Sequence, residues 1–196
     1  MSIDKPTPSE SEQPGITTTA LLDRANSGDE AARDALFQRV LPMLRRFARG
    51  RLPAWGRDSA ETEDLVQITL LRAFKRLGDF KAERPGAFLS YLRTIMMNAV
   101  RDEIRKKGRR PHSTSSVEEA VIDPESVVAN VVGMETIDAY EGAMAELNEG
   151  RREAVMMHVE FGMTYAEVAL ELGLPSANAA RMRIKRGLEE VARLMP

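Results

Sequence analysis

The side chains best suited to contact a nucleic acid lie on one face of the helix predicted after Ser176. At 100° per residue its predicted core stripe centres on Ile184, and the opposite face is polar and cationic. The other members of this stripe are Ala177, Ala180, Leu188 and Val191. Asn can bond an adenine edge in the major groove, and Arg or Lys can reach guanine or phosphates. A solvated helix face is the alternative for any single charge. The pattern predicts that Asn178 and Met182 contact bases. Phosphate contacts are predicted for Arg183, Lys185 and Arg186, and Arg181 lies at the flank of the same face.

The segment before that helix carries the capping signals of a helix-turn-helix. Thr164 and Glu167 have the spacing of a capping box, in which each side chain satisfies a backbone N–H at a helix start. Gly173 is the predicted stop of this first helix, and Ser176 is the predicted N-cap of the next. Two short helices joined by a glycine turn are typical of DNA-binding domains.

The charge of the chain is unevenly distributed. Residues 36–110 hold 18 basic and 8 acidic residues, a net +10, whereas residues 111–146 hold 8 acidic residues and no basic one. The first 35 residues carry −4, and residues 147–196 are neutral. A block at +10 favours a polyanionic partner, because Lys and Arg displace the counterions condensed on phosphates. Its last helix ends in five basic residues between Arg105 and Arg110, more than the helix dipole alone calls for.

Composition excludes several kinds of chemistry. The 196 residues include no cysteine and only two histidines, which removes disulfides, cysteine nucleophiles and the usual zinc ligands. The sequence has no glycine-rich phosphate loop and no hydrolase motif. We therefore expect no catalytic residue, no metal, no cofactor and no enzyme. No apolar run approaches the ~20 residues that span a bilayer, and the polar N-terminus does not resemble a secretory signal, so we expect a cytoplasmic protein.

Helical periodicity runs through the chain, and the sequence predicts an all-α fold of two small helical domains joined by a flexible acidic linker. Residues 1–18 are expected to be disordered because they are rich in Pro, Ser, Thr and Glu. A short helix is predicted around residues 20–25. Asp29 is the predicted N-cap of a longer helix towards Arg51, which Pro42 should kink or split.

Two more helices complete the predicted N-terminal domain, residues 19–110. Thr62 is expected to cap a helix that runs to Leu77, and a loop over residues 77–86 leads into a long helix with Phe88 on its buried stripe. Residues 111–133 are predicted to be the linker. The helical pattern resumes near Met134, and residues 134–196 form the predicted C-terminal domain.

Two separated motifs make the chain from about Thr19 onwards similar to the extracytoplasmic-function (ECF) sigma factors of the sigma-70 family. The segment 63–74, which reads EDLVQITLLRAF, and the segment 88–105 resemble two adjoining helices of the family's region 2. The segment 163–173 together with residues 183–186 resembles region 4. Tyr91 stands where the family often has Trp, and the turn at 174–177 is one residue longer than the usual pattern.

The resemblance implies a role for each motif. In the family, region 2 faces the clamp helices of the polymerase's largest subunit, and here the implied contacts are Asp64, Gln67 and Arg72. Capture of the single-stranded −10 element needs cations beside faces on which unpaired bases stack, and Phe80 is the favoured face. Region 4 reads the double-stranded −35 element through the cationic helix face described above. The −10 contacts implied are Asp79, Phe80, Lys81, Arg84, Tyr91, Arg93, Asn98, Arg101 and Arg105.

The resemblance also implies the partners: core RNA polymerase and promoter DNA, with an anti-sigma protein as a further candidate and no membrane. Such a protein supplies promoter specificity and strand opening without bond chemistry of its own. The acidic linker either mimics RNA inside the polymerase channels or serves as a solubilising tether, and both interpretations stay open. The alternative function is a stand-alone helix-turn-helix regulator that dimerises through residues 36–110, although such a face should be apolar rather than strongly basic.

Overall fold

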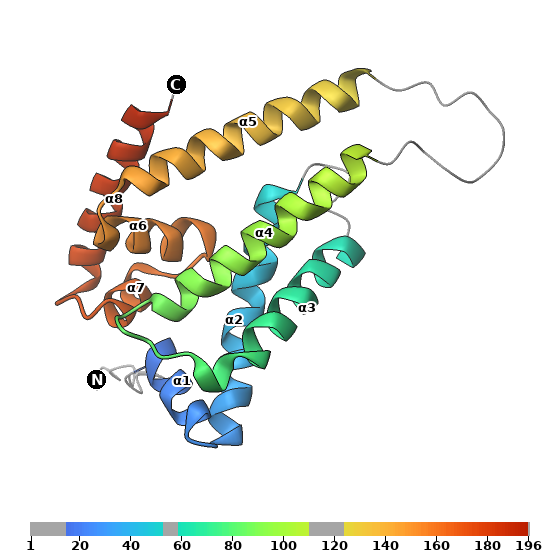
Figure 1. Ribbon diagram of the computed structural model, residues 1–196. Coiled ribbons are helices and arrows are strands. Elements are labelled where there is room, and N and C mark those ends of the chain that lie inside the picture. The colour runs from blue at the N-terminus through green and yellow to red at the C-terminus, as the bar shows by residue number, and fades with distance from the viewer. Residues whose placement is uncertain (1–14, 53–58, 110–123, 196) are drawn as a thin grey trace, which may run out of the picture.

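The computed structural model describes residues 15–52, 59–109 and 124–195, and within these ranges it contains helices and no strand (Figure 1). The all-α prediction is confirmed. None of the described helices combines the length and hydropathy that crossing a bilayer requires. The elements are α1 (Thr18–Asn26), α2 (Glu30–Arg51), α3 (Ser59–Lys75), the 3-10 turn η2 (Leu77–Asp79), α4 (Ala87–Arg109), α5 (Pro124–Glu146), α6 (Glu149–Val155), the π-helical turn η3 (Met156–Glu160), α7 (Tyr165–Glu171) and α8 (Ala177–Leu194).

The turn between α1 and α2 forms as its sequence predicts. Gly28 has a φ of 91°, a conformation that glycine adopts without strain. Asp29 then caps α2 by accepting a hydrogen bond from the backbone N–H of Ala32 at 3.0 Å. Pro42 lies inside α2 but does not split it, so that part of the prediction is wrong. Burial on both sides of the proline, by Val40 before it and Leu44 after it, favours one continuous helix.

Two expected boundaries at the N-terminal side need correction. Residues 15–18, assigned to a disordered segment, are ordered: Thr17 caps α1, and Thr18 is 2% exposed. The rest of that segment, residues 1–14, lies outside the described residues. Thr62 does not cap α3, because the helix begins at Ser59 and Thr62 is fully buried within it. The buried face of α3 extends towards the N-terminus beyond Leu65, the first apolar residue of the periodic pattern, to the buried Thr62. The helix therefore starts earlier than that pattern indicates.

The N-terminal core is formed by the facing sides of α1, α2, α3 and α4. Phe37 of α2 meets Phe74 of α3 edge to face, with ring centroids 5.8 Å apart. Such pairs add specific geometry to apolar burial, the main source of stability for helices of this length. The fully buried side chains of this core include Leu36, Leu44, Phe47, Phe88, Leu89, Leu92 and Met96.

Helix α5 begins ten residues earlier than the helical pattern predicted near Met134. It starts at Pro124, so residues 124–133, assigned to the linker, are helical. Proline suits a first helical position, because its φ is already helical and its missing N–H has no helical partner there. At the other end, Arg152 donates to the carbonyls of Met144, Ala145 and Leu147 at 2.7–2.9 Å, which satisfies the exposed end of α5.

The helix-turn-helix of α7 and α8 has the predicted caps. Thr164 and Glu167 form both bonds of the capping box, Gly173 turns the chain with a φ of 62°, and Ser176 accepts from the backbone N–H of Ala179 at 3.2 Å. The buried stripe of α8 contains Ile184 as expected. It differs in that Ala177 and Leu188 are exposed, whereas Gly187 is buried; the other buried members are Ala180 and Val191.

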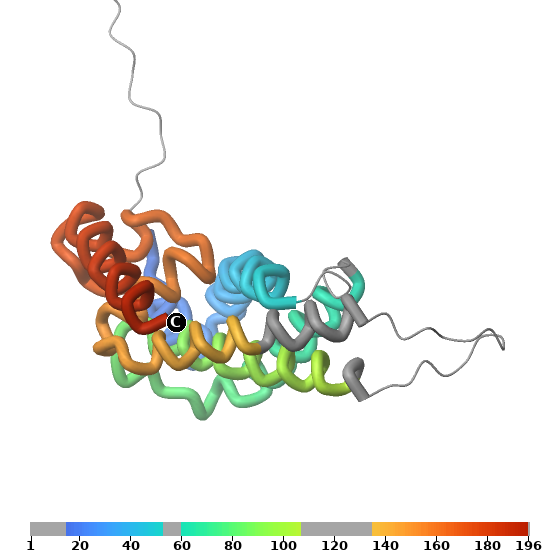
Figure 2. The backbone as a smooth tube through the Cα atoms, turned by 90° about the horizontal axis from the view of Figure 1, so that it is seen from above, coloured from blue at the N-terminus to red at the C-terminus, as the bar shows by residue number. Residues whose placement is uncertain are grey.

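The two predicted domains lie against each other. In the views of Figures 1 and 2, α6, α7 and α8 gather at one end of the molecule and α3 lies at the other, while α5 runs alongside α4 in the opposite direction. The turn η3 packs against α2. It has the wider i→i+5 bonding of a π-helix, in which Phe161 N–H donates to the Met156 carbonyl at 3.1 Å. This turn directs Glu160 of the C-terminal domain towards the N-terminal domain.

Candidate nucleic-acid interface

The predicted DNA-reading side chains of α8 form one exposed face, which we term the recognition face. Asn178 and Met182 are both exposed near the helix start. The Asn178 carbonyl accepts from the Arg181 guanidinium at 3.1 and 3.3 Å, so these two side chains already support each other. Arg183 is half-buried. The recognition face therefore consists of Asn178, Arg181, Met182, Arg183, Lys185 and Arg186.

A hollow of about 500 Å³ opens beside the recognition face, between α6 and α8. Arg183 and Arg186 line it from α8, and Arg151 lines it from α6. Arg151 also pairs with Glu190 at 2.5 Å. Arg151 could not be predicted from the sequence, because its nearness to α8 depends on how α6 and α8 pack. A Cβ at Gly187 would lie 2.6 Å from Val155 of α6, so only a glycine permits this close crossing.

Helix α3 presents a second exposed face, which we term the docking face. Asp64 and Gln67 point to solvent as predicted, and Arg72 is exposed at its edge. Between them lie Ile68, 39% exposed, and Leu71, 71% exposed. Large apolar side chains with this exposure on one helix face are typical of a protein contact. The two apolar members were in the sequence motif, but their exposure becomes clear only once the buried side of α3 is known.

The aromatic residues of the expected strand-capture site are packed together. Phe80 stacks on Tyr91 with centroids 5.0 Å apart and meets Phe88 edge to face at 5.4 Å. Phe88 is 1% exposed and belongs to the core, as its position on the apolar stripe indicates. Asn26 of α1 donates to the Phe80 carbonyl at 3.0 Å, which fixes the backbone of the loop. Phe80 and Tyr91 are half-buried, so part of the surface of each ring stays exposed to solvent.

Three of the four arginines expected to meet the −10 strand, Arg84, Arg93 and Arg101, are paired with acidic residues of the C-terminal domain. Arg84, in the loop before α4, pairs with Glu153 and lies 2.9 Å from Glu149. Arg101, two turns beyond Arg93 on α4, pairs with Asp138 of α5 at 3.1 Å.

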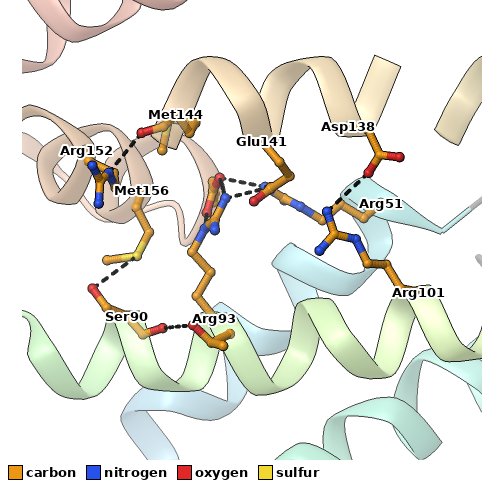
Figure 3. Close-up of polar contacts among 11 residues, drawn as sticks. Arg51, Ser90, Arg93, Arg101, Asp138, Glu141, Met144, Arg152 and Met156 are labelled. Atoms are coloured by element: carbon orange, nitrogen blue, oxygen red, sulfur yellow. Dashed lines mark hydrogen bonds and ion pairs between the residues drawn. The ribbon is translucent and has the colours of Figure 1, made fainter. Parts of the chain in front are cut away.

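Arg93 lies at the centre of the network between the domains (Figure 3). Its Nε donates to Glu160 Oε2 at 2.6 Å, and its Nη2 donates to Glu141 Oε1 at 2.6 Å. Arg51 of α2 approaches the same two carboxylates from the other side, donating to Glu160 at 2.6 Å, and its guanidinium lies 3.7 Å from the centre of the Phe47 ring. The network thus contains two arginines from the N-terminal domain and two glutamates from the C-terminal domain.

Burial strengthens the electrostatics of this network. The Glu160 side chain is 2% exposed and that of Arg93 is 16% exposed. Burial opposes the charge on Arg93, but the hydrogen bonds and charges of Glu160 and Glu141 outweigh it and raise the pKa of Arg93 above its ordinary value. Burial and the Glu160 carboxylate likewise raise the pKa of Tyr140. Arg93 therefore stays charged, and its charge depends on the two carboxylates that it contacts.

The other predicted −10 residues are free of this network. Asp79, Lys81, Asn98 and Arg105 are exposed, and Arg105 makes only a long 4.0 Å contact to Asp102 within α4. The structure thus brings Phe80 and Tyr91 together at the loop, whereas Arg84, Arg93 and Arg101 lie against the C-terminal domain. Within the described ranges, no three His, Asp or Glu side chains are arranged to hold a metal ion.

The fold and these surfaces define an all-α protein with a helix-turn-helix domain, a basic N-terminal domain and an apolar docking face. Residues 36–110 match the model of Sigma-70 region 2, and residues 137–191 match that of Sigma-70 region 4. The chain belongs to the sigma-70 family and is an RNA polymerase sigma factor of the ECF type.

Known relatives cover most of the chain. It is 30% identical to RNA polymerase sigma factor CarQ of Myxococcus xanthus over 89% of this chain and 95% of that protein. It is 28% identical to ECF RNA polymerase sigma factor SigC of Mycobacterium tuberculosis over 86% of this chain and 85% of that one. A solved structure of CnrH in complex with the cytosolic domain of CnrY is 26% identical, covers 90% of this chain and 96% of that chain, and has a TM-score of 0.41.

Proposed function

We propose that this sigma factor binds core RNA polymerase through the docking face of α3, reads the −35 element with the recognition face of α8, and captures one strand of the −10 element with the loop before α4 and the arginines of α4. The protein catalyses no reaction in this scheme. It acts in the cytoplasm with the polymerase and supplies sequence recognition and strand opening.

The observation that carries this proposal is the cationic recognition face, held by an intact helix-turn-helix. Ser176 caps the start of α8, so Asn178 and Met182 lie in its first two turns. The N-terminal part of a recognition helix is the part that contacts base edges in the major groove. Arg186 and Lys185 are exposed further along the same face, where they can reach phosphates.

Strand capture is supported by the arrangement around Phe80. A stacked base contributes about 1–3 kcal/mol, and a captured base cannot return to the duplex, so stacking on the exposed part of Phe80 or Tyr91 favours strand opening. Lys81 and Arg105 are exposed near the two ends of this region and can hold the backbone of the strand.

The test is run-off transcription with purified core polymerase on fragmented genomic DNA, with start sites mapped in the presence and absence of the chain. We expect new start sites preceded by a shared pair of sequence elements. Core alone gives the background. Start sites identical to that background would refute the function.

The −35 assignment is tested with a promoter from that experiment. Arg186→Ala should weaken binding across sequences and reduce the slope of log K against log salt by about one, as the loss of one phosphate contact requires. Arg193→Ala is the matched control, since Arg193 is an exposed arginine of the last turn of the same helix. Equal salt slopes for the two variants would remove Arg186 from the interface.

A further inference from the structure

We infer that the free chain inhibits itself: acidic residues of its own C-terminal domain occupy the arginines that the promoter strand needs. We term these residues the acidic face, and the arrangement in which they contact Arg84, Arg93 and Arg101 the closed arrangement. The inference rests on the proposed function, because that proposal assigns the three arginines to the −10 strand. The acidic face consists of Asp138, Glu141, Glu149, Glu153 and Glu160.

The contacts form a regular series along α4. Arg84 meets Glu149 and Glu153, Arg93 meets Glu141 and Glu160, and Arg101 meets Asp138. Apart from Glu160 of η3, the partner numbers fall from Glu153 and Glu149 through Glu141 to Asp138 while the arginine numbers rise, because α5 runs opposite to α4 (Figure 1). The acidic face therefore follows the basic residues from Arg84, in the loop before α4, to Arg101 within α4, as a phosphate backbone could. Carboxylates and phosphates are alternative partners for the same guanidinium groups.

The burial of these ion pairs favours the replacement of their carboxylates by the phosphates of a DNA strand. Glu160 and Glu153 have side chains 2% and 9% exposed, and Arg51 is 10% exposed. Removing such charges from water offsets much of their attraction, so a buried ion pair adds little net stability. Losing one partner alone is far more costly. A DNA strand that supplies phosphates as it displaces the carboxylates keeps every arginine paired, so the exchange avoids that cost.

A second contact holds the same arrangement from the N-terminal side. Glu171 of α7 is 5% exposed and accepts hydrogen bonds from both the backbone N–H and the hydroxyl of Thr18, each at 2.7 Å. Arg39 of α2 lies 3.4 Å from the same carboxylate and donates to the Ile16 carbonyl. Three buried glutamates, one each on α6, η3 and α7, thus contact the N-terminal domain.

The closed arrangement is tested first by a distance in the free, full-length chain. The sequence has no cysteine, so Ala35→Cys on α2 and Ala192→Cys on α8 place two spin labels at exposed alanines, one in each domain. We expect one narrow distance distribution. Adding Glu141→Gln with Glu160→Gln should broaden it and move it to longer distances. A distribution that is already broad before these substitutions overturns the inference.

The inhibition is tested with a single-stranded probe, a fluorescent oligo(dT) of about 20 nucleotides, which needs no knowledge of the promoter. The Glu141→Gln, Glu160→Gln variant should bind it at least about fivefold more tightly than the control, the lower end of couplings between two states. The control is Glu135→Gln with Glu146→Gln, which changes the net charge equally at exposed positions of α5. Equal affinities for the two variants overturn the inference.

Asp138→Lys covers the case in which the buried substitutions unfold the domain. Asp138 is 59% exposed, so its replacement leaves the core intact while it repels Arg101. This variant should also lengthen the spin-label distance and tighten oligo(dT) binding, and a wild-type result in both measurements counts against the inference. Failure of the proposed function would be distinguishable, because the spin-label distance requires neither polymerase nor DNA.

Discussion

Arg93 and Glu160 bond at 2.6 Å although 67 residues separate them in the sequence. The first belongs to the helix expected to meet the −10 strand, and the second to the turn that leads into the helix-turn-helix. Their bond therefore links the two DNA-binding parts of the sigma factor, and with Arg51 and Glu141 it forms the most deeply buried charged network between the domains in the described part of the chain.

The close crossing of α6 and α8 predicts a stability difference between two glycines. Gly187→Ala should destabilise the chain by about 1–3 kcal/mol, because the new Cβ would lie 2.6 Å from Val155 and overpack the core. Gly142→Ala in α5 has open space around the new Cβ and should stabilise the chain by up to about 1 kcal/mol. Urea unfolding followed by circular dichroism measures both. A Gly187→Ala chain as stable as the wild type would mean that the crossing is looser than described.

The start of the recognition helix is tested at Ser176. Its hydroxyl accepts from the backbone N–H of Ala179, so Ser176→Ala should cost about 0.5–2 kcal/mol, whereas Ser176→Gly should cost only a few tenths. The same pair should differ in the amide-exchange protection of the first turn of α8. If the two variants were equally stable, the cap would contribute nothing to the helix.

The docking face predicts that Leu71 contributes to the affinity for core polymerase but hardly to the stability of the free chain. Leu71→Ser should weaken binding to core polymerase by about tenfold, which equals about 1.4 kcal/mol, because a largely exposed leucine becomes buried only in a complex. The melting temperature should hardly change. Leu194→Ser is the control, since Leu194 is 43% exposed at the end of α8. Titration of labelled core gives the affinities, and an equal effect of both substitutions would contradict the assignment.

Two half-buried carboxyls, those of Asp29 and Glu63, predict how the free energy of unfolding depends on pH. Hydrogen bonds from the Ala32 N–H and from Arg24 hold the pKa of Asp29 below its ordinary 3.8, and the hydrogen bond from Arg45 holds the pKa of Glu63 below its ordinary 4.5. Groups whose pKa is lowered by folding stabilise the protein above the unfolded values and lose that contribution as the pH falls through the folded ones. The free energy of unfolding should therefore fall between about pH 5 and pH 3.

The acid dependence is assigned by comparing variants. Asp29→Asn combined with Glu63→Gln should show a shallower decrease of the urea midpoint over the same pH interval than the wild type. Glu83→Gln, an exposed carboxyl in the loop before α4, is the control and should follow the wild type. Parallel curves for all three proteins would assign the acid dependence to other groups.

Local chemistry could be predicted from the sequence, and long-range packing could not. Thr164 and Glu167 are three residues apart, and Ser176 acts on Ala179, so their caps depend on short stretches of chain alone. The partners of Arg93 lie 48 and 67 residues away, and no period in the sequence connects them. The positive block at 36–110 was visible from its charge, but which of its arginines are occupied depends on how the domains pack.

The buried sector of α8 shows the same limit within one helix. Angular spacing placed Leu188 in the core, whereas Gly187 is buried and Leu188 is 39% exposed. The close crossing at Gly187 draws the contact with α6 to one side of the stripe that the apolar residues define. A glycine carries no apolar signal, so a hydrophobic pattern alone could not locate this contact.

The wide turn at Met156–Glu160 also limits which insertions and deletions the sequence can accept. Deleting one residue there would restore an ordinary turn but would rotate everything beyond it by about 100° relative to α6. Glu160 would then swing away from Arg51 and Arg93, and the helices that follow would be displaced as a unit. Insertions and deletions should therefore be poorly tolerated within this turn, because its length sets the orientation of α7 and α8 relative to α6.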